Sequence, residues 1–386
     1  MSDVRIGVIG VGTMGRIHAA YLDRGEVKGA RLTAVCDINP QALQWAEKSL
    51  SSHVRRFATN DDFFAQAPVD AVMIVTPHYS HPELAIRAFA QDLHVLIEKP
   101  AGVFTRQVRE MNEAADAAGT VFAIMFCNRT FPVYQKAREL IHGGELGELK
   151  RINWTVTDWY RSQSYYDSGG WRATWKGEGG GVLLNQAPHE LDLWQWMFGL
   201  PQRVRAFCHF GKYHEIEVED DVTAYMEYAD GATGVFITST GEAPGTNRLE
   251  VAGDRGRLVV ENGQMRFDRL RVSEREFNRT YRGGFGSPEV WQCHIPVGPN
   301  PENKHLVVTQ NWVNAIVHGT PLLCDGREGI RSLELSNAMH LSSWQDEWVT
   351  LPVDEELFEA ELRRRIAASV DKAAFDTTYL DAEKSF

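Results

Sequence analysis

Cysteine is scarce in this 386-residue sequence, and its distribution argues against a disulfide-stabilised protein and against a zinc protein. The five cysteines are scattered and never spaced as Cys-x-x-Cys, and an odd number cannot form a complete disulfide framework. The sequence also has no cluster of histidine, cysteine and glutamate at metal-ligand spacing, so we expect no metal site. The pattern is typical of reduced thiols in a cytoplasmic protein. The cysteines are Cys36, Cys127, Cys208, Cys293 and Cys324.

Long hydrophobic runs and an excess of positive charge are also missing. No apolar run approaches the roughly 20 residues that a membrane-spanning helix needs, and the sequence does not open like a signal peptide because a strand pattern begins almost at once. Lysine and arginine number 40 against 52 acidic residues, which gives a net charge of −12. We therefore expect neither a membrane nor a nucleic acid as partner.

The most informative stretch stands at the start of the chain. An apolar, β-branched run at 4–9 predicts a buried strand, and Gly10-x-Gly12-x-x-Gly15 then leads into a helical pattern at 16–24. Gly10 suits a tight turn, Gly12 allows a pyrophosphate to approach the backbone, and Gly15 allows close helix–strand packing. A second strand pattern ends at Asp37, where a carboxylate can bind ribose hydroxyls. The stretch predicts a dinucleotide site; the alternative is an ordinary βαβ unit with turn glycines.

The same alternation of apolar strands and longer helices continues to residue 126. It predicts an α/β fold with a doubly wound parallel sheet of the Rossmann type. Ligands of such sheets lie beyond the carboxyl ends of the strands. The unusual residues of this part of the chain fall there: Gly10, Asp37, Thr76, Pro77, Glu98, Lys99, Pro100 and the segment 127–129.

Composition changes after the helical pattern at 132–142. Polar–apolar alternation and Asp-Gly or Asn-Gly turns predict a large, open, mainly antiparallel sheet. We predict strands at 149–160, 204–210, 221–228, 234–240, 248–252, 257–261 and 264–271. Helical patterns at 305–318 and 326–343 should return to the first domain, and 354–386 should be a charged amphipathic helix and a loose end. We thus expect a dinucleotide-binding domain at 1–128 and a substrate-binding, oligomerising α/β domain at 129–386.

A second informative stretch runs from Gly177 to Gly199. A glycine-rich approach precedes a helical pattern, and Pro188 must lie in the first turn of that helix. We expect the helix to begin near Asn185, which would put Asn185, His189 and Asp192 on one face together with Trp196. The alternative is structural: an N-cap asparagine, a satisfied core histidine and its acidic partner.

The alternative interpretation of Lys99 is an ordinary surface lysine at the end of a strand. However, Pro100 holds Lys99 in an extended conformation at the carboxyl edge of the parallel sheet. A lysine and a histidine beside a hydride acceptor are enough to oxidise a secondary alcohol. The ammonium stabilises developing alkoxide charge, and a neutral imidazole takes the proton.

Aromatic and basic residues alternate between these two stretches. Aromatic faces suit a sugar ring, and Arg172 would suit a phosphate or carboxylate; the alternative is a long loop packed on the sheet or on a neighbouring subunit. The predicted substrate-binding residues are Arg129, Tyr160, Trp171, Arg172, Asn185 and Asp192.

Taken together, the motifs resemble the glucose–fructose oxidoreductase / inositol dehydrogenase / rhizopine-catabolism (Gfo/Idh/MocA) family along nearly the whole chain. The residues that carry the resemblance are Gly10-x-Gly12-x-x-Gly15, Thr76-Pro77 with His81, Glu98-Lys99-Pro100, and the glycine-rich block with Asn185, His189 and Asp192. The resemblance implies that Lys99 and His189 are catalytic, that the Lys99–Pro100 peptide is cis, and that the protein is a homo-oligomer, a dimer or a tetramer. Family substrates are usually sugars, sugar derivatives or cyclic polyols.

One position departs from many members of the family, which have aspartate where this chain has Asn185. An amide cannot hold a negative charge beside Lys99, so we expect Lys99 to lose one charge partner and His189 to be the base. A subset of sugar dehydrogenases shares the Asn-Gln-x-x-His form.

These observations predict an NAD(P)-dependent dehydrogenase that oxidises a ring secondary alcohol. Asp37 favours NAD, because its charge would repel a 2′-phosphate, while Arg16 keeps NADP open. The alternatives are a redox-neutral enzyme with tightly bound NAD that acts on glycosides, and a non-catalytic regulator that binds dinucleotide and sugar. We predict Lys99, His189 and Asn185 as catalytic residues, with Asp192 holding the imidazole. The predicted cofactor-binding residues are Gly10, Gly12, Thr13, Met14, Gly15, Asp37, Thr76, Pro77, His81, Glu98 and Lys99.

Overall fold

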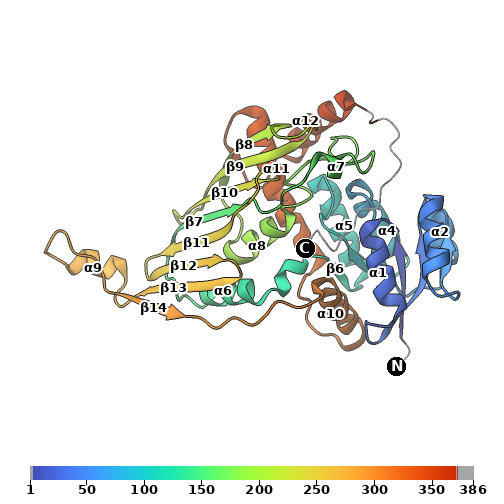
Figure 1. Ribbon diagram of the computed structural model, residues 1–386, viewed down its shortest axis with the longest axis horizontal. Coiled ribbons are helices and arrows are strands. Elements are labelled where there is room, and N and C mark those ends of the chain that lie inside the picture. Colours follow the sequence, from blue (N-terminus) through green and yellow to red (C-terminus); the bar gives the residue numbers. More distant parts are fainter. Residues whose placement is uncertain (1–2, 371, 373–386) are drawn as a thin grey trace.

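The computed structural model describes residues 3–370 and residue 372, and two β-sheets organise them (Figure 1). One sheet has six strands and the other has nine. Helices α1, α2 and α4 lie with the smaller sheet at one end of the molecule, and the larger sheet forms the other end.

The six-stranded sheet is parallel and has the order β3-β2-β1-β4-β5-β6. Its strands are β1 (Val4–Ile9), β2 (Ala30–Cys36), β3 (Arg55–Phe57), β4 (Ala71–Ile74), β5 (His94–Ile97) and β6 (Phe122–Ile124). Its helices are α1 (Thr13–Asp23), α2 (Pro40–Ser49), α3 (Asn60–Gln66), α4 (His81–Phe89) and α5 (Thr105–Ala118), with a 3₁₀ turn η1 (His78–Ser80). The central strands are apolar on both faces, as strands covered on both sides must be.

The strand order predicts a ligand-binding site at the carboxyl ends of β1 and β4. The chain crosses from β1 to β2 and β3 on one side, and then returns to β4 on the other side. The carboxyl ends of β1 and β4 therefore lie side by side at the point where the order reverses, which is where doubly wound sheets bind ligands. The Rossmann-type fold that the sequence predicts is confirmed.

The nine-stranded sheet has the order β14-β13-β12-β11-β7-β10-β9-β8-β15. Its strands are β7 (Leu149–Val156), β8 (Arg203–Phe210), β9 (Glu219–Glu227), β10 (Thr233–Ser239), β11 (Asn247–Gly253), β12 (Gly256–Glu261), β13 (Gln264–Leu270), β14 (Val290–His294) and β15 (Val349–Thr350). Among the described strands of this sheet only β7 and β10 pair in parallel, and the other neighbours pair antiparallel. The predicted mainly antiparallel sheet is thus confirmed.

The remaining helices cover this sheet and join it to the first one. They are α6 (Pro132–His142), α7 (Gln163–Tyr166), α8 (Pro188–Phe198), α9 (Glu274–Thr280), α10 (Lys304–His318), α11 (Gly329–Gln345) and α12 (Glu355–Ala368), with 3₁₀ turns η2 (Cys127–Thr130) and η3 (Gly326–Glu328). Helices α6 and α8 lie on one face of the sheet, and α9 with β14 projects far from the body as an arm (Figure 1).

The last third of the chain also contributes to the first domain. Thr309 of α10 bonds Tyr21 of α1, and Asp325 forms a β-bridge with Ala123 of β6. Segments from the last third of the chain therefore pack on the N-terminal domain. The domain division at residue 128 stays a prediction.

Several predicted boundaries were wrong. The strand predicted at 149–160 ends at Val156, and the chain then turns into the loop that contains the aromatic residues. The helix predicted to begin near Asn185 begins at Pro188, because proline fits the first helical position, where its missing N–H costs nothing. Residues 182–187 form turns, so Asn185 does not share a helical face with His189. Of the predicted tail, α12 is helical, and 371 and 373–386 lie outside the described residues.

Candidate active site

The glycine loop after β1 has the shape that a dinucleotide phosphate requires. Gly10 has φ +94°, and a Cβ there would lie 2.6 Å from the Val75 carbonyl oxygen. A Cβ at Gly15 would lie 1.9 Å from the carbonyl oxygen of Gly10, so helix α1 packs directly on the loop. Gly12 differs: a Cβ would meet nothing within 4 Å, and no side chain caps the start of α1. The N–H groups of the first helical turn, which include Thr13 and Met14, therefore suit a pyrophosphate.

Asp37 stands at the carboxyl end of β2 and is fixed by two backbone donors. Its Oδ2 accepts from the N–H of Val11 at 2.6 Å, and its Oδ1 accepts from the N–H of Asn39 at 2.7 Å. The carboxylate is thus held against the glycine loop, where an adenosine ribose would lie. The residues fit a dinucleotide such as NAD.

The predicted residues after β4 form a bonded unit. Ser80 Oγ donates to Thr76 Oγ1 at 2.8 Å. His81 is completely buried, and its two ring nitrogens lie 2.7 Å from the Thr76 carbonyl oxygen and 2.8 Å from the Pro100 carbonyl oxygen. Its side chain therefore connects the ends of β4 and β5, while contact of Thr76, Pro77 or His81 with the cofactor stays a prediction.

Lys99 follows β5, and its cis peptide bond to Pro100 agrees with the family resemblance. Its Nζ donates to the backbone oxygen of Asn185 at 2.5 Å. Burial lowers the pKa of Lys99, and the nearby carboxyl groups of Glu98 and Glu178 act in the opposite direction. The side chain therefore reaches from the first sheet to the start of α8.

Glu178 is a site residue that the sequence analysis missed. The carboxyl group accepts from Asn185 Nδ2 and from the N–H of Ala173, the latter at 2.5 Å, and the residue is 2% exposed. Burial raises its pKa. The expectation that Lys99 loses a charge partner was wrong in this respect, because Glu178 supplies a carboxyl group seven residues before Asn185. Its position as a charged residue within the glycine run was the available signal.

His189 lies in the first turn of α8 and is buried. Burial lowers the pKa of its imidazole well below the usual value, and the charges of Lys99 and Lys304 act in the same direction. The ring is therefore neutral at physiological pH and can accept a proton. Within the described residues its Nδ1 is buried without a hydrogen-bond partner, which is the state expected of an atom that bonds a ligand.

Asp192 does not hold the imidazole, and that prediction was wrong. Its carboxylate takes a bidentate pair of bonds from Arg129, with Nε to Oδ2 at 2.8 Å and Nη2 to Oδ1 at 2.6 Å, and both side chains are 1% exposed. Gln195 Nε2 donates the third bond to this carboxylate, at Oδ1. Arg129 also bonds Glu328 and the carbonyl oxygen of Leu323. The pair links η2, α8 and η3, and its predicted contact with substrate stays untested.

The predicted aromatic residues divide into two groups. Arg172 is stacked between Trp171 and Tyr165, at 4.5 Å and 4.6 Å from the ring centroids, and it donates to the Tyr165 hydroxyl at 2.9 Å. Trp171 packs edge-on against buried His78, whose Nδ1 lies 3.0 Å from the Glu178 carbonyl oxygen. This group therefore adjoins the Glu178–Asn185 pair. Tyr160 instead stands half exposed.

A second group joins Asn128, in the segment singled out from the sequence, to two residues that the sequence analysis missed, Lys304 and Glu190. Lys304 Nζ donates to Asn128 Oδ1 at 3.1 Å, and Asn128 Nδ2 donates to Glu190 Oε1 at 3.2 Å. Glu190 is 1% exposed, and burial raises its pKa to about 8. These residues come from α10, η2 and α8, so no local sequence pattern brings them together.

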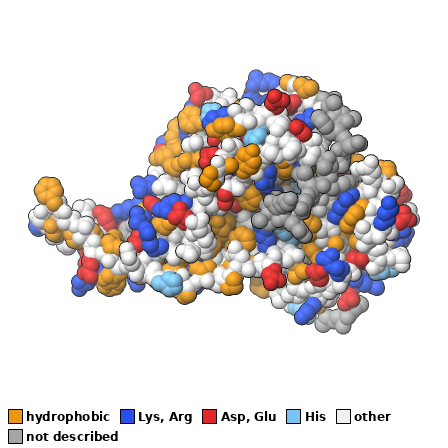
Figure 2. Space-filling model, in the orientation of Figure 1, with side chains coloured by type: hydrophobic (Ala, Val, Ile, Leu, Met, Phe, Trp, Pro, Cys, Tyr) orange, Lys and Arg blue, Asp and Glu red, His pale blue; other side chains and the backbone are white. Residues whose placement is uncertain are grey.

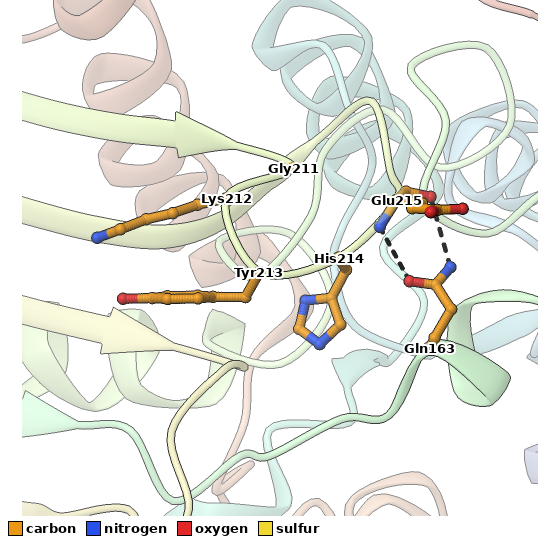
Figure 3. A pocket seen from close by; sticks show the side chains of 6 residues that line it. All are labelled: Gln163, Gly211, Lys212, Tyr213, His214 and Glu215. Atoms are coloured by element: carbon orange, nitrogen blue, oxygen red, sulfur yellow. Dashed lines mark hydrogen bonds between the residues drawn. The ribbon is translucent and has the colours of Figure 1, made fainter.

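A cavity of about 500 Å³ lies at the connection between β8 and β9 (Figure 3), and its lining residues are different from those of the site above. Figure 3 shows Gln163 bonded to Glu215 across it, and the lining is completed by Gly211, Lys212, Tyr213 and His214. His214 is used internally, since its ring nitrogens face Asp220 and the Arg161 carbonyl oxygen. Gln163, Glu215 and His214 thus already have hydrogen-bond partners within the protein.

The described residues lack two further features. They contain no group of three or more histidine, cysteine, aspartate or glutamate residues placed to hold a metal ion. None of their helices is long and apolar enough to cross a membrane.

A Rossmann sheet with an open phosphate loop, next to a buried lysine and a neutral buried histidine, defines a dinucleotide-dependent oxidoreductase. Comparison with known proteins agrees. Residues 4–126 match the oxidoreductase family with an NAD-binding Rossmann fold, and residues 134–259 match the GFO/IDH/MocA C-terminal domain. The chain belongs to the Gfo/Idh/MocA family of NAD-dependent oxidoreductases.

Individual relatives resemble the chain over most of its length. It is 26% identical to an inositol 2-dehydrogenase of Rhizobium meliloti, over 87% of this chain and 95% of that protein. It is 22% identical to a levoglucosan dehydrogenase of Pseudarthrobacter phenanthrenivorans, over 91% and 99%. Among solved structures, the WlbA dehydrogenase of Bordetella pertussis in complex with NADH and UDP-GlcNAcA has a TM-score of 0.76 and 28% identity, over 91% of this chain and 100% of that one.

Proposed function

We propose that the protein is an NAD-dependent dehydrogenase that oxidises a ring secondary alcohol of a sugar, an anhydrosugar or a cyclic polyol. The observation that carries the proposal is the contact between Lys99 Nζ and the backbone oxygen of Asn185, at 2.5 Å. His189 follows Asn185 by four residues and is buried, and its Nδ1 lacks a partner among the described residues. An ammonium group and a proton acceptor are thereby available to one hydroxyl.

In the proposed reaction, bound NAD supplies the hydride acceptor. His189 takes the hydroxyl proton of the substrate, because its neutral imidazole is a base at physiological pH. Lys99 donates to the same oxygen and stabilises the negative charge that develops as the proton leaves. Glu178 holds the Asn185 amide and contributes negative charge beside Lys99, which opposes the effect of burial on the ammonium. Asn185 and Arg172 then orient the ring.

The cofactor preference rests on Asp37. The carboxylate is held against the glycine loop by Val11 and Asn39, and its charge would repel a 2′-phosphate. The preference for NAD over NADP is therefore part of the proposal.

The substrate class rests on the stacked group of Trp171, Arg172 and Tyr165, together with the relatives. Aromatic rings suit the C–H face of a sugar, and a guanidinium suits hydroxyl, carboxylate or phosphate oxygens. The relatives include dehydrogenases named for inositol and levoglucosan and a structure with a bound nucleotide sugar acid. Ring alcohols are common to these compounds.

The experiment that tests the proposal is the reduction of NAD, followed by absorbance, against a panel of cyclic polyols, aldoses, anhydrosugars and nucleotide sugars. Reduction with one substrate class, and much less with NADP, is the expected result. Tight binding of NAD without turnover of any compound would favour the redox-neutral enzyme or the regulator instead. The Lys99→Met variant is the control for a contaminating dehydrogenase.

We further propose a cytoplasmic homo-oligomer. All five cysteines are free thiols and four are buried, as in proteins of a reducing compartment. Exposed aromatic residues lie on β8 and β9 and on the arm of α9 and β14, where Figure 2 shows hydrophobic side chains at the tip. Phe285, between α9 and β14, is fully exposed, and α9 buries none of its residues. Light scattering should give the mass of a dimer or tetramer; a monomer at micromolar concentration would contradict this.

A further inference from the structure

Arg172 forms no ion pair with a carboxylate in the part of the chain that the structure describes. Its guanidinium lies between Trp171 and Tyr165, at 4.5 Å and 4.6 Å from the ring centroids, and its Nη1 donates to the Tyr165 hydroxyl at 2.9 Å. Arg129 differs, because its guanidinium makes a bidentate pair with Asp192. The charge of Arg129 is therefore used within the protein, and the charge of Arg172 is available to a ligand.

The two aromatic rings and the Tyr165 hydroxyl fix the guanidinium of Arg172 before a ligand binds. Stacking holds the plane of a guanidinium while its edge stays open to oxygen atoms. A guanidinium has five N–H donors, and the bond to Tyr165 uses one of them. Nε and Nη2 have no partner among the described residues and are not buried, so a ligand can reach them. Arg172 is thus a preorganised donor for an anion.

The guanidinium is also connected to the proposed reaction centre. The Tyr165 hydroxyl accepts from Gln186 Nε2 at 3.1 Å as well as from Arg172. Gln186 directly follows Asn185, whose backbone oxygen bonds Lys99 Nζ. Burial lowers the pKa of Lys99, and the charge of Arg172 acts in the same direction. The two cations therefore lie close enough for their charges to interact, as two groups that bind one substrate must.

Glu178 is an acidic group near Arg172, but the two side chains do not form an ion pair. The Glu178 oxygens accept from Asn185 Nδ2 and from the backbone N–H of Ala173, so each oxygen has a donor other than the guanidinium. Burial raises the pKa of Glu178, and the charge of Arg172 acts in the opposite direction. An incoming anion can therefore take the place beside Arg172 that no carboxylate of the described chain fills.

We propose that the substrate is an anionic ring alcohol, whose carboxylate or phosphate group binds Arg172 while a ring hydroxyl lies between Lys99 and His189. The inference rests on the proposed function and narrows it to sugar acids and sugar phosphates, because neutral polyols and anhydrosugars have no such group. A guanidinium binds both kinds of oxyanion through two parallel hydrogen bonds. Trp171 and Tyr165 are then positioning residues, since they fix the plane of the guanidinium.

The test is calorimetry of the protein saturated with NADH, using sets of ligands that differ at one ring substituent. Each set contains a hexose, its uronate and its 6-phosphate, in the gluco, galacto and manno series; a UDP-linked hexose and the UDP-linked uronate form a further set. In at least one set the uronate or the phosphate should bind at least about tenfold more tightly than the hexose. The tighter of the two identifies the group. Hexoses that bind as tightly as their charged partners in every set, or no binding of any charged member, would overturn the proposal.

A variant of Arg172 shows whether this side chain is responsible. Arg172→Gln keeps hydrogen-bond donors and removes the charge, so the charged ligand should bind about 10- to 100-fold more weakly and the hexose no more than about threefold. Arg138→Gln is the matched control, because Arg138 also stacks on a tryptophan, Trp196 at 4.7 Å, and should leave both affinities unchanged. Equal losses for both ligands in Arg172→Gln would contradict the proposal. Should that variant fail to fold, Arg172→Lys keeps the charge without the planar fork and should also weaken the charged ligand selectively.

Binding needs no turnover, so this inference and the proposed function can fail separately. A charged sugar that binds through Arg172 without reducing NAD would contradict the proposed function and support the inference. Oxidation of neutral polyols with the same kcat/KM in wild type and Arg172→Gln would do the reverse. Where a charged substrate is turned over, Arg172→Gln should raise its KM more than it lowers kcat.

Discussion

Replacing Glu190 by glutamine should make the stability of the protein less dependent on pH. Glu190 lies beside His189 in the first turn of α8 and is 1% exposed. Its Oε1 accepts from Asn128, and its Oε2 has no partner among the described residues. Burial raises its pKa to about 8, so the carboxyl group is largely neutral in the folded protein at pH 7.

The sign and size of the effect follow from proton linkage. Between the ordinary pKa of 4.5 and the folded value of about 8, the folded state keeps a proton that the unfolded state has released. Stability contributed by this group is therefore complete below pH 4.5 and is lost as pH rises through about 8. Each unit corresponds to about 1.4 kcal/mol, so the full change is ~5 kcal/mol. Glutamine has the shape of the neutral acid and cannot ionise.

The assay is urea unfolding of wild type and Glu190→Gln at about pH 5 and about pH 9. We expect the wild type to lose several kcal/mol more than the variant between the two conditions. Glu139→Gln is the control, because Glu139 is an exposed helix residue paired with Lys136 and should change nothing beyond about 0.5 kcal/mol. Equal losses in wild type and Glu190→Gln would refute the reasoning.

Three further changes have defined outcomes. Lys99→Met should lower kcat by about 10²–10⁴-fold and leave the Kd for NAD, measured by fluorescence titration, within about threefold; equal losses would contradict its role. Asp192→Asn should cost about 3–5 kcal/mol in urea unfolding, because Arg129 stays buried with a weakened partner; a loss below 1 kcal/mol would contradict this. Asp37→Ala should raise the Kd for NAD about tenfold and narrow the preference over NADP, as titration with both would show; unchanged values would remove Asp37 from the site.

Local sequence patterns predicted the parts of the fold that local physics determines. The glycine loop is set by steric needs within a few residues, since a Cβ at Gly10 or Gly15 would strike backbone atoms. The buried strands are continuous apolar runs, and the antiparallel sheet has alternating residues. The arm of α9 and β14 was missed, because its residues are exposed and follow no core pattern.

Site residues could be proposed from the sequence where one segment carries the pattern, and not where distant segments meet. Lys99 and His189 could be singled out because each stands in a distinctive motif, and their catalytic roles stay predictions. Glu178 stands in the glycine run, but its bond to Asn185 is visible only in the fold, and Lys304 comes near His189 only through the tertiary structure. Asp192 was given the wrong partner for the same reason, because Arg129 lies 63 positions away in sequence.

The return of the last third of the chain to the first domain has a consequence for synthesis. A ribosome that has made the first 128 residues has completed every strand of the Rossmann sheet, but Ala123 has no bridge to Asp325 and Tyr21 has no bond to Thr309. The hydroxyl of Tyr21 gains its partner on α10 only after α10 emerges. The phosphate loop therefore exists early in the life of the chain, while the contacts that complete its domain form only when the last third has been made.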